Sequence, residues 1–346
     1  MSAGLRVATL EPAEEPACEN FVERHPQASF FHRPGWRRVL KRAYGYHTHY
    51  RVAWRGSEIA GVLPLTHVKT LLFGDALVST GFCVYGGIAA NDAAAADALA
   101  ADAAALGTRL GVDHVELRQQ QPLDNDWPVK DQLYVTFRKR LAADQDANLK
   151  AIPRKKRADV RKALRNDALR IETDVPVDDF FRIYGVSVRN HGTPVFPKRF
   201  FSAVKAEFGD AVEISAVAGP DGLLTGLVTY FFRDQVMPYY GGAVPAARKV
   251  HAYDLMYYRL MGRALERGAT LFDFGRSKRG TGSFDFKTYW GFEPENLPYT
   301  YHLVKAKDLP DVNPNNPKYK LMIDIWRRLP VPIANLCGPF IARQLG

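Results

Sequence analysis

The chain has 346 residues, of which 47% are hydrophobic and 24% are charged. This is a globular composition, and the length suits two domains. No segment approaches ~20 uninterrupted apolar residues, which excludes a membrane-spanning helix, and the acidic start predicts no signal peptide. The three cysteines, Cys18, Cys83 and Cys337, lie far apart. They predict neither a disulfide framework nor a zinc site, and they favour a reducing, cytoplasmic location.

The formal net charge of +10 is concentrated in one stretch. Residues 150–165 hold eight basic side chains and one acidic side chain, Asp159. A basic cluster confined to so short a stretch indicates a polyanionic partner, such as RNA, phosphates or an anionic membrane surface.

Hydrophobic periodicity predicts a set of strands and one helix in the first half of the chain. In chain order they are a strand at 47–54, a turn at 55–58, a strand at 59–66, an apolar segment at 76–88, a helix from Asn91 to about Leu110 and a strand at 112–118. The second half repeats this order. Its elements are a strand at 212–218, a turn at 219–222, strands at 223–232 and 236–244, a helix at 251–267 and a strand at 270–275.

Local residues agree between the two copies. Tyr85-Gly86-Gly87 in the first matches Tyr240-Gly241-Gly242 in the second. We therefore predict two copies of one α/β (α+β) unit, each a mixed, mainly antiparallel sheet flanked by helices. This order of elements resembles the core of the GNAT acetyltransferase fold. The expected boundaries are a first domain at 1–140, a basic linking helix at 141–168, a second domain at 169–306 and a tail at 307–346.

A basic helix is predicted between the two copies. Pro153 suits a first helical position, and no further glycine or proline follows until Pro176, so 154–166 should be helical. Four arginines recur on one face of this helix, namely Arg154, Arg157, Arg161 and Arg165. The face is either a solvated surface or a salt-sensitive grip for tRNA or substrate phosphates. No nucleic-acid-binding module accompanies it, so we expect no DNA partner.

The densest group of chemically active residues lies at 272–294. A strand ends at Gly275, a cationic loop follows, Ser283 is a candidate N-cap, 284–290 is a short helix, and Gly291 ends it. The segment lacks the lysine of a phosphate-binding P-loop and the second glycine of a nucleophile elbow. His47 and His49 share a strand face without an evident further ligand, so no metal site is predicted.

Several motifs resemble the FemAB family, in particular the branch associated with PEP-CTERM/exosortase and exopolysaccharide gene clusters. They are the run from Asp273 to Lys278, the triplet Gly280-Thr281-Gly282 and the pattern Phe286-Lys287-x-x-Trp290-Gly291-x-Glu293-Pro294. The segments 29–31, 35–36, 192–198, 316–319 and 338–339 agree as well. The similarity covers nearly the whole chain.

This resemblance implies tandem GNAT-like domains that move an amino acid from aminoacyl-tRNA to an amine on a cell-envelope acceptor. No bound cofactor is implied. The long coiled-coil arm of some relatives has no counterpart in this sequence. An acyl-CoA-dependent N-acyltransferase and a non-catalytic polyanion-binding protein remain alternatives.

The resemblance also suggests roles for single residues. Lys287 would stabilise the oxyanion of the tetrahedral intermediate. Asp273 or Asp285 would help to deprotonate the amine, with Glu116 as the counterpart of Asp273 in the first copy. Arg276 and Lys278 would hold a phosphate or carboxylate of the substrate. Further substrate contacts are expected from Trp36, Arg37, Lys41, Tyr240 and Trp290.

The tail mixes aliphatic, aromatic and basic residues over 319–345. It is expected either to dock on the first domain or to rest on a membrane surface near a lipid-linked acceptor. The second alternative would place a cytoplasmic protein at the inner face of the membrane.

Overall fold

The computed structural model describes residues 4–70, 74–310 and 317–345. The chain forms two compact units, each with its own sheet. The first unit comprises residues 1–133, 296–312 and 343–346, and the second comprises 134–295 and 313–342. No helix in the described part of the chain combines the length and the apolarity that crossing a membrane requires.

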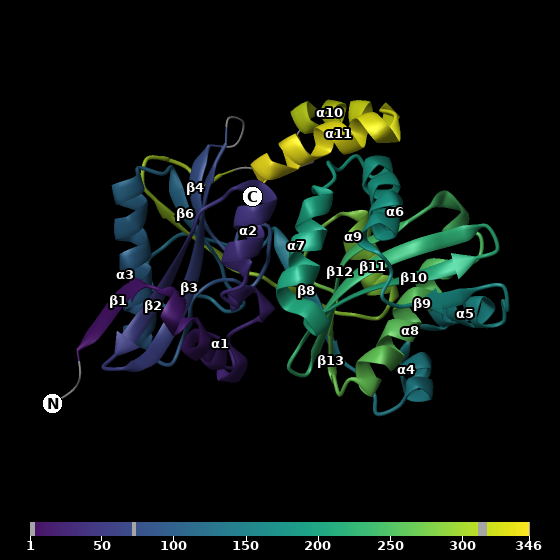
Figure 1. Ribbon diagram of the computed structural model, residues 1–346, viewed down its shortest axis with the longest axis horizontal. Helices are drawn as coiled ribbons and strands as arrows, with labels where there is room; N and C mark the ends of the chain where they lie inside the picture. The colour runs from purple at the N-terminus through teal and green to yellow at the C-terminus, as the bar shows by residue number, and fades with distance from the viewer. Residues whose placement is uncertain (1–3, 71–73, 311–316, 346) are drawn as a thin grey trace. The chain divides into compact units, whose positions relative to one another are not determined.

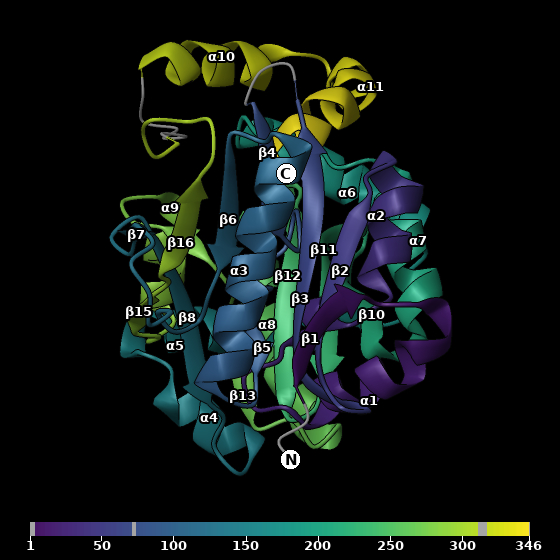
Figure 2. The same ribbon diagram turned by 90° about the vertical axis from the view of Figure 1, so that its left-hand side faces the viewer.

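The first unit is built on a mixed sheet whose strands follow the order β1-β2-β3-β4-β6-β16-β7, with β5 paired to β3. Its strands are β1 (Leu5–Thr9), β2 (Thr48–Arg55), β3 (Glu58–Lys69), β4 (Asp75–Ser79), β5 (Ala89–Ala90), β6 (His114–Arg118), β7 (Val129–Lys130) and β16 (Tyr299–Leu303). Among the described strand pairs of this sheet, β4–β6 is the parallel one. Helix α3 (Ala93–Leu110) covers one face, while α1 (Glu15–Arg24) and α2 (Trp36–Tyr44) cover the other (Figures 1 and 2).

The second unit has a sheet of the same kind, with the strand order β14-β8-β13-β12-β11-β10-β9 and β15 paired to β8. Its strands are β8 (Tyr134–Arg140), β9 (Arg170–Glu172), β10 (Val212–Gly219), β11 (Gly222–Phe232), β12 (Gln235–Ala243), β13 (Leu271–Asp273), β14 (Ser277–Lys278) and β15 (Pro294–Asn296). Along this order of described strands, β12 and β13 run parallel and the other pairs are antiparallel. The predicted fold class, two mixed and mainly antiparallel sheets flanked by helices, is therefore confirmed.

Helices cover both faces of this second sheet. Its helices are α4 (Gln145–Ala151), α5 (Arg154–Leu164), α6 (Val177–Asn190), α7 (Lys198–Phe208), α8 (Ala252–Glu266), α9 (Gly282–Tyr289), α10 (Pro317–Arg328) and α11 (Val331–Ala342). Neighbouring residues of β11 show the two faces: Gly226 lies against Phe180 of α6, whereas Leu227 belongs to the core that includes α8. Helices α4 and α5 pack on α8.

The two sheets exchange their last strands. Strand β8, expected in the first domain, pairs with β13 and β14 in the second sheet. Strand β16, expected in the second domain, pairs with β6 and β7 in the first sheet. The expected boundaries at 140 and 306 therefore differ from the observed units, because hydrogen bonding between distant strands leaves no mark in local sequence.

The tail forms the helices α10 and α11, which pack on α6 of the second unit (Figure 1). The last residues of the tail, from Arg343 on, belong to the first unit, as one of the two expectations stated, and the Tyr46 hydroxyl donates to the Arg343 carbonyl at 2.6 Å. Close packing holds α11 in the second unit: Gly338 of α11 lies so near Val195 that a Cβ there would come within 2.7 Å of a Val195 methyl carbon.

Local signals place most helix ends correctly, although the segment after β4 differs. Asp92 caps α3 by accepting a hydrogen bond from the Ala95 amide, and Gly111 ends it with a φ of 66°. The apolar segment at 76–88 was expected to continue as a strand. It leaves the extended conformation after Ser79, and Thr80, Phe82 and Tyr85 all adopt positive φ.

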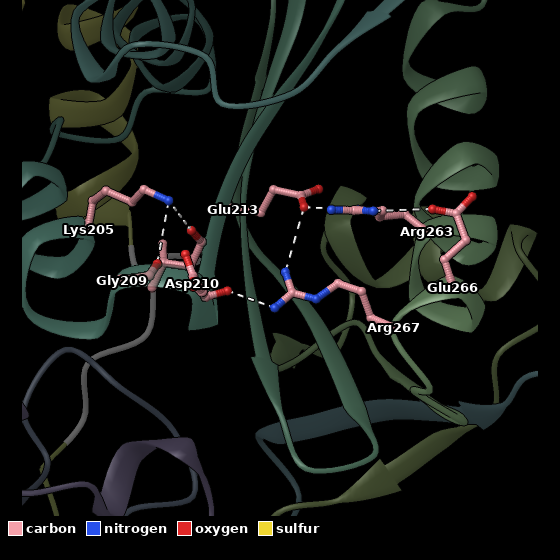
Figure 3. A network of polar contacts seen from close by, with 8 residues as sticks. Lys205, Gly209, Asp210, Glu213, Arg263, Glu266 and Arg267 are labelled. Carbon is pink, nitrogen blue, oxygen red and sulfur yellow. Dashed lines mark hydrogen bonds and ion pairs between the residues drawn. The ribbon is translucent and has the colours of Figure 1, made fainter.

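A buried carboxylate ties β10 to α8 (Figure 3). Glu213 is 5% exposed and pairs with Arg263 at 3.1 Å and with Arg267 at 3.7 Å. Arg267 also donates to the Asp210 carbonyl at 2.7 Å and lies over the Phe231 ring. Lys205 at the end of α7 donates to the Val212 carbonyl at 2.7 Å. These contacts hold helices from both faces at the start of β10.

Removing both arginines should destabilise the second unit. The double variant Arg263→Ala/Arg267→Ala leaves Glu213 buried without its cations, and we expect the free energy of unfolding to fall by about 3–5 kcal/mol. Urea unfolding measures this change. The control is Arg259→Ala, which removes an exposed arginine of the same helix and should change stability little. Equal stability of the double variant and the control would contradict the role of this network.

Candidate functional site

Lys287 lies in the segment that the sequence singled out, and it is buried. It sits on α9 with 8% of its surface exposed. Its Nζ donates to the carbonyl oxygens of Gly275 at 2.8 Å and Arg276 at 3.0 Å, and it lies 5.5 Å from the centre of the Phe137 ring of β8. An ammonium group has three donors, so two are used by the backbone and one remains.

The turn after β13 aims these carbonyls at Lys287. Gly275 has a φ of 69°, a conformation that a residue with a Cβ rarely adopts. Asp273 fixes the same turn, because its Oδ1 accepts from the Gly275 amide at 2.6 Å and from the Thr136 hydroxyl at 3.3 Å. The glycine and the aspartate therefore shape the backbone that holds the lysine.

Helix α9 begins two residues earlier than the capping signal suggested. Thr281, not Ser283, is the N-cap, and its side chain makes no capping bond. The Thr281 hydroxyl donates to the Lys278 carbonyl at 2.7 Å, and Ser283 donates to the Ser277 hydroxyl at 3.0 Å. The Ser283 hydroxyl that was expected to cap the helix instead closes the loop between β14 and α9, together with the Thr281 hydroxyl. The predicted stop at Gly291 is confirmed by its φ of 77°.

The surroundings of Lys287 disfavour its charge. Burial lowers the pKa of Lys287 to about 7, the Asp273 carboxylate opposes this shift, and the Arg276 guanidinium adds to it. A lysine near half-protonation at neutral pH is a frequent mark of a functional site.

Of the three candidate catalytic residues, Lys287 and Asp273 lie near each other at Gly275, whereas Asp285 does not join them. Asp273 is 2% exposed and is engaged by the turn that it shapes. Asp285 is exposed and lies two residues from Lys287 on a helix, so the two side chains leave it on different sides. Glu116, the counterpart of Asp273 in the first unit, pairs with Arg118 at 2.7 Å.

Arg276 and Lys278 gather around one aromatic ring. Their cationic groups lie 4.5 and 5.3 Å from the centre of the Tyr134 ring of β8. Both side chains are half-buried. Tyr134 was not singled out in the sequence, because the pairing that brings it here joins residues more than 140 positions apart.

Most other predicted substrate contacts belong to the packed interior. Trp290 and Tyr240 are 1% and 7% exposed and pack among aromatic rings. Trp36 is 1% exposed, and its indole nitrogen donates to the Phe30 carbonyl at 2.9 Å. Arg37 pairs with Glu15 at 3.0 Å, whereas Lys41 is exposed. Of this group, Lys41 is exposed and Arg37 is half-buried.

The basic helix α5 packs by one side and shows cations on the other. Val160 and Ala163 are buried against the core shared with α8. Arg154, Arg161 and Arg165 are exposed, and Arg157 is half-buried with a bond to the Lys150 carbonyl at 2.7 Å. The predicted cationic face is thus available to a partner.

A cluster that the sequence did not single out occupies the first turn of α8. The Asp254 carboxylate pairs with Lys156 at 2.9 Å, and His251 lies 3.6 Å from Asp254 and 3.7 Å from Asp159. The three potential ligands Asp159, His251 and Asp254 lie within 4.8 Å of one another. Because the Lys156 ammonium group already contacts Asp254, we interpret the cluster as an ion-pair network.

A pocket of about 480 Å³ lies in the first unit, near the N-terminus of α3. Its polar lining consists mainly of amide groups and a few other side chains, including Asn91, Gln119, Gln120, Gln121 and Asp124. Of the described residues that line it, none is a lysine or arginine. Its described lining therefore offers a phosphate no cationic side chain, and neither Arg37 nor Lys41 belongs to it.

Comparisons with known proteins agree with this geometry. Residues 153–288 match the family described as Acetyltransferase (GNAT) domain. The crystal structure of FemX superposes with a TM-score of 0.67 at 15% identity, covering 92% of this chain and 100% of FemX. The chain has a tandem GNAT-like fold.

Two further structures share this fold. A tandem GNAT protein from the clavulanic acid biosynthesis pathway has a TM-score of 0.53 at 12% identity and covers 88% of this chain and 100% of its own. The C-terminal domain of a putative lysylphosphatidylglycerol synthetase from Agrobacterium fabrum has a TM-score of 0.56 at 12% identity, covering 84% of this chain and 91% of that one. No curated protein matches the sequence.

Burial of Lys287 predicts a dependence of stability on pH. The unfolded chain keeps this proton up to about pH 10, whereas the folded chain loses it near pH 7. The folded state therefore gains stability as the pH rises through this window. Between about pH 6 and pH 9, the unfolding free energy of the wild type should rise by about 2–3 kcal/mol relative to Lys287→Met. Urea unfolding of both proteins at the two pH values measures the difference, and parallel pH dependences would contradict the buried state of the amine.

Proposed function

We propose that this protein is an acyl- or aminoacyltransferase of the FemAB type, with Lys287 as the group that stabilises the oxyanion. The observation that carries the proposal is a buried lysine with a lowered pKa, held by two carbonyls at the end of β13 in a GNAT-like unit. A buried amine costs stability, and such a cost is typical of functional sites.

Acyl transfer to an amine requires a cation beside the oxygen that becomes negatively charged in the tetrahedral intermediate. The acceptor amine bonds to the acyl carbon, and the carbonyl oxygen takes the electron pair to become an oxyanion. The intermediate then collapses, expels the hydroxyl or thiol of the donor, and the proton of the amine leaves with that group or to solvent. In the protonated state, Lys287 keeps one N–H for the oxyanion while the other two hold the Gly275 and Arg276 carbonyls.

The helix termini favour aminoacyl-tRNA over acyl-CoA as the donor. A helix N-terminus binds the phosphates of a ligand when it offers free N–H groups and no competing negative charge. In this protein, Asp254 lies in the first turn of α8, and Asp92 caps α3 while pairing with Arg55. At the N-terminus of α8 and at that of α3, the pyrophosphate of CoA would therefore meet a carboxylate. Helix α5, in contrast, offers exposed arginines to a polynucleotide.

The acceptor is proposed from the sequence motifs. The resemblance to the exosortase-associated branch of FemAB proteins suggests an amine on a cell-envelope or exopolysaccharide intermediate. The likeness to a domain of a putative lysylphosphatidylglycerol synthetase is compatible with a fold that handles aminoacyl groups.

Two substitutions of Lys287 should distinguish the effect of its charge on turnover from the effect of its size and shape. Lys287→Met should lower turnover by about 10²–10³-fold, because the oxyanion loses a donor. Wild-type turnover should fall as the pH rises above about 7, since the neutral amine has only the two hydrogens that the carbonyls engage. Lys287→Arg should keep a smaller activity without this descending limb, because guanidinium stays charged.

The measurement is the release of labelled amino acids from charged tRNA in the presence of amines extracted from the cell envelope. Circular dichroism shows that each variant is folded. Undiminished turnover of Lys287→Met would rule out the catalytic role of the lysine.

A binding titration should identify the donor. We expect charged tRNA to bind in a salt-sensitive manner, and Arg161→Glu to weaken binding about tenfold at low salt. The control Arg109→Glu reverses an exposed arginine on α3 of the first unit and should leave tRNA binding unchanged. Tight binding of acetyl-CoA without tRNA binding would assign the protein to the acyl-CoA class. Binding of tRNA without any turnover would favour a non-catalytic polyanion-binding protein.

A further inference from the structure

Exposed apolar side chains concentrate on the two C-terminal helices. Among the described residues, eight large hydrophobic side chains are more than a third exposed, and five of them lie on α10 and α11. These five are Met322, Ile325, Ile333, Leu336 and Phe340. A patch of this kind on a globular protein marks a surface that contacts another molecule or a membrane.

Helix α11 is oriented opposite to an ordinary surface helix. Its buried residues are small and recur every fourth position, at Ala334, Gly338 and Ala342. Leu336 and Phe340 are 71% and 72% exposed and lie on the opposite side with Ile333. A surface helix normally turns its large apolar residues towards the core.

Close packing fixes this orientation. A Cβ at Gly338 would lie 2.9 Å from the Val195 backbone nitrogen, and a Cβ at Gly185 of α6 would lie 2.6 Å from the Asn335 side chain. Only the side with small residues fits this approach. The large residues are thus held outwards, where most of their apolar surface remains exposed to water.

Positive charge flanks the apolar surface. Arg327 and Arg328 are exposed at the end of α10, and Arg328 lies about 60° around the helix from Ile325. The sequence of the two helices contains four basic residues and one acidic residue, Asp324, and α11 carries no charge at all. Helices with an apolar face and basic neighbours bind the interface of anionic membranes.

The length of α11 excludes insertion across a bilayer. Its 12 residues span about 18 Å, less than the ~30 Å hydrocarbon core. We propose that α10 and α11 form a docking surface for an anionic phospholipid bilayer, with Ile333, Leu336 and Phe340 in the interface and the arginines against the headgroups. This docking is independent of the proposed acyl transfer, because it involves neither Lys287 nor a donor.

Sedimentation of the full chain with lipid vesicles tests the proposal. The wild type should bind vesicles of phosphatidylcholine with about one third phosphatidylglycerol, and should bind pure phosphatidylcholine much more weakly. Leu336→Asp/Phe340→Asp should reduce the partition coefficient at least about tenfold. Arg327→Gln/Arg328→Gln should reduce it about fivefold for each charge removed.

Control variants elsewhere in the chain test whether vesicle binding depends on this surface or only on the overall positive charge and apolarity of the protein. Val129→Asp/Ile171→Asp changes two exposed aliphatic residues outside the tail and should bind like the wild type. Arg109→Gln/Arg259→Gln removes two exposed charges outside α5 and the tail and should also bind like the wild type. All altered side chains are exposed, and circular dichroism verifies folding.

Two outcomes would overturn the proposal. The first is equal binding of anionic vesicles by the wild type and by Leu336→Asp/Phe340→Asp. The second is absence of vesicle binding by the wild type together with self-association that the same pair of substitutions abolishes, which analytical ultracentrifugation detects. That second result would assign the surface to a second copy of the chain.

Discussion

The pairing of β8 with β13 and β14 is the contact on which the candidate site depends. One short strand brings Tyr134 beneath Arg276 and Lys278, Thr136 to Asp273, and Phe137 to the side of Lys287. Without it, the lysine would lose its apolar cover, and water would restore its ordinary pKa. The strand comes from the sequence before the basic helix, so the second sheet is incomplete until a distant segment joins it.

A buried amine opposes folding, and the surrounding structure compensates for this cost. Two backbone carbonyls replace part of the lost hydration of Lys287, and the nearby Asp273 carboxylate favours its charge. The aspartate achieves this while shaping the turn at Gly275. Stability and the proposed chemistry therefore depend on the same few atoms. Because the turn at Gly275 engages the Asp273 carboxylate, this residue is better suited to positioning Lys287 than to proton transfer.

The charges outside this site divide into two groups. Some cations are neutralised within the fold, as Lys156 is by Asp254 and as Arg263 and Arg267 are by Glu213. Others face solvent on α5 and at the end of α10. In the first group, the Asp254 carboxylate lies in the first turn of α8, where a phosphate could otherwise bind. The second group is left for polyanions, a polynucleotide at α5 and anionic lipid at the tail in the functions proposed above.

The sequence by itself determined the repeated order of elements and the basic helix, and it singled out Lys287, because periodicity and short motifs are local. It also placed the helix ends at Gly291 and near Leu110. Tertiary structure alone decided which strand completes which sheet, that Trp36 and Trp290 are interior, and that Tyr134 belongs to the site. It also turned the large residues of α11 outwards. Each of these features depends on contacts between distant segments, and a local sequence pattern does not show which distant segment it will contact.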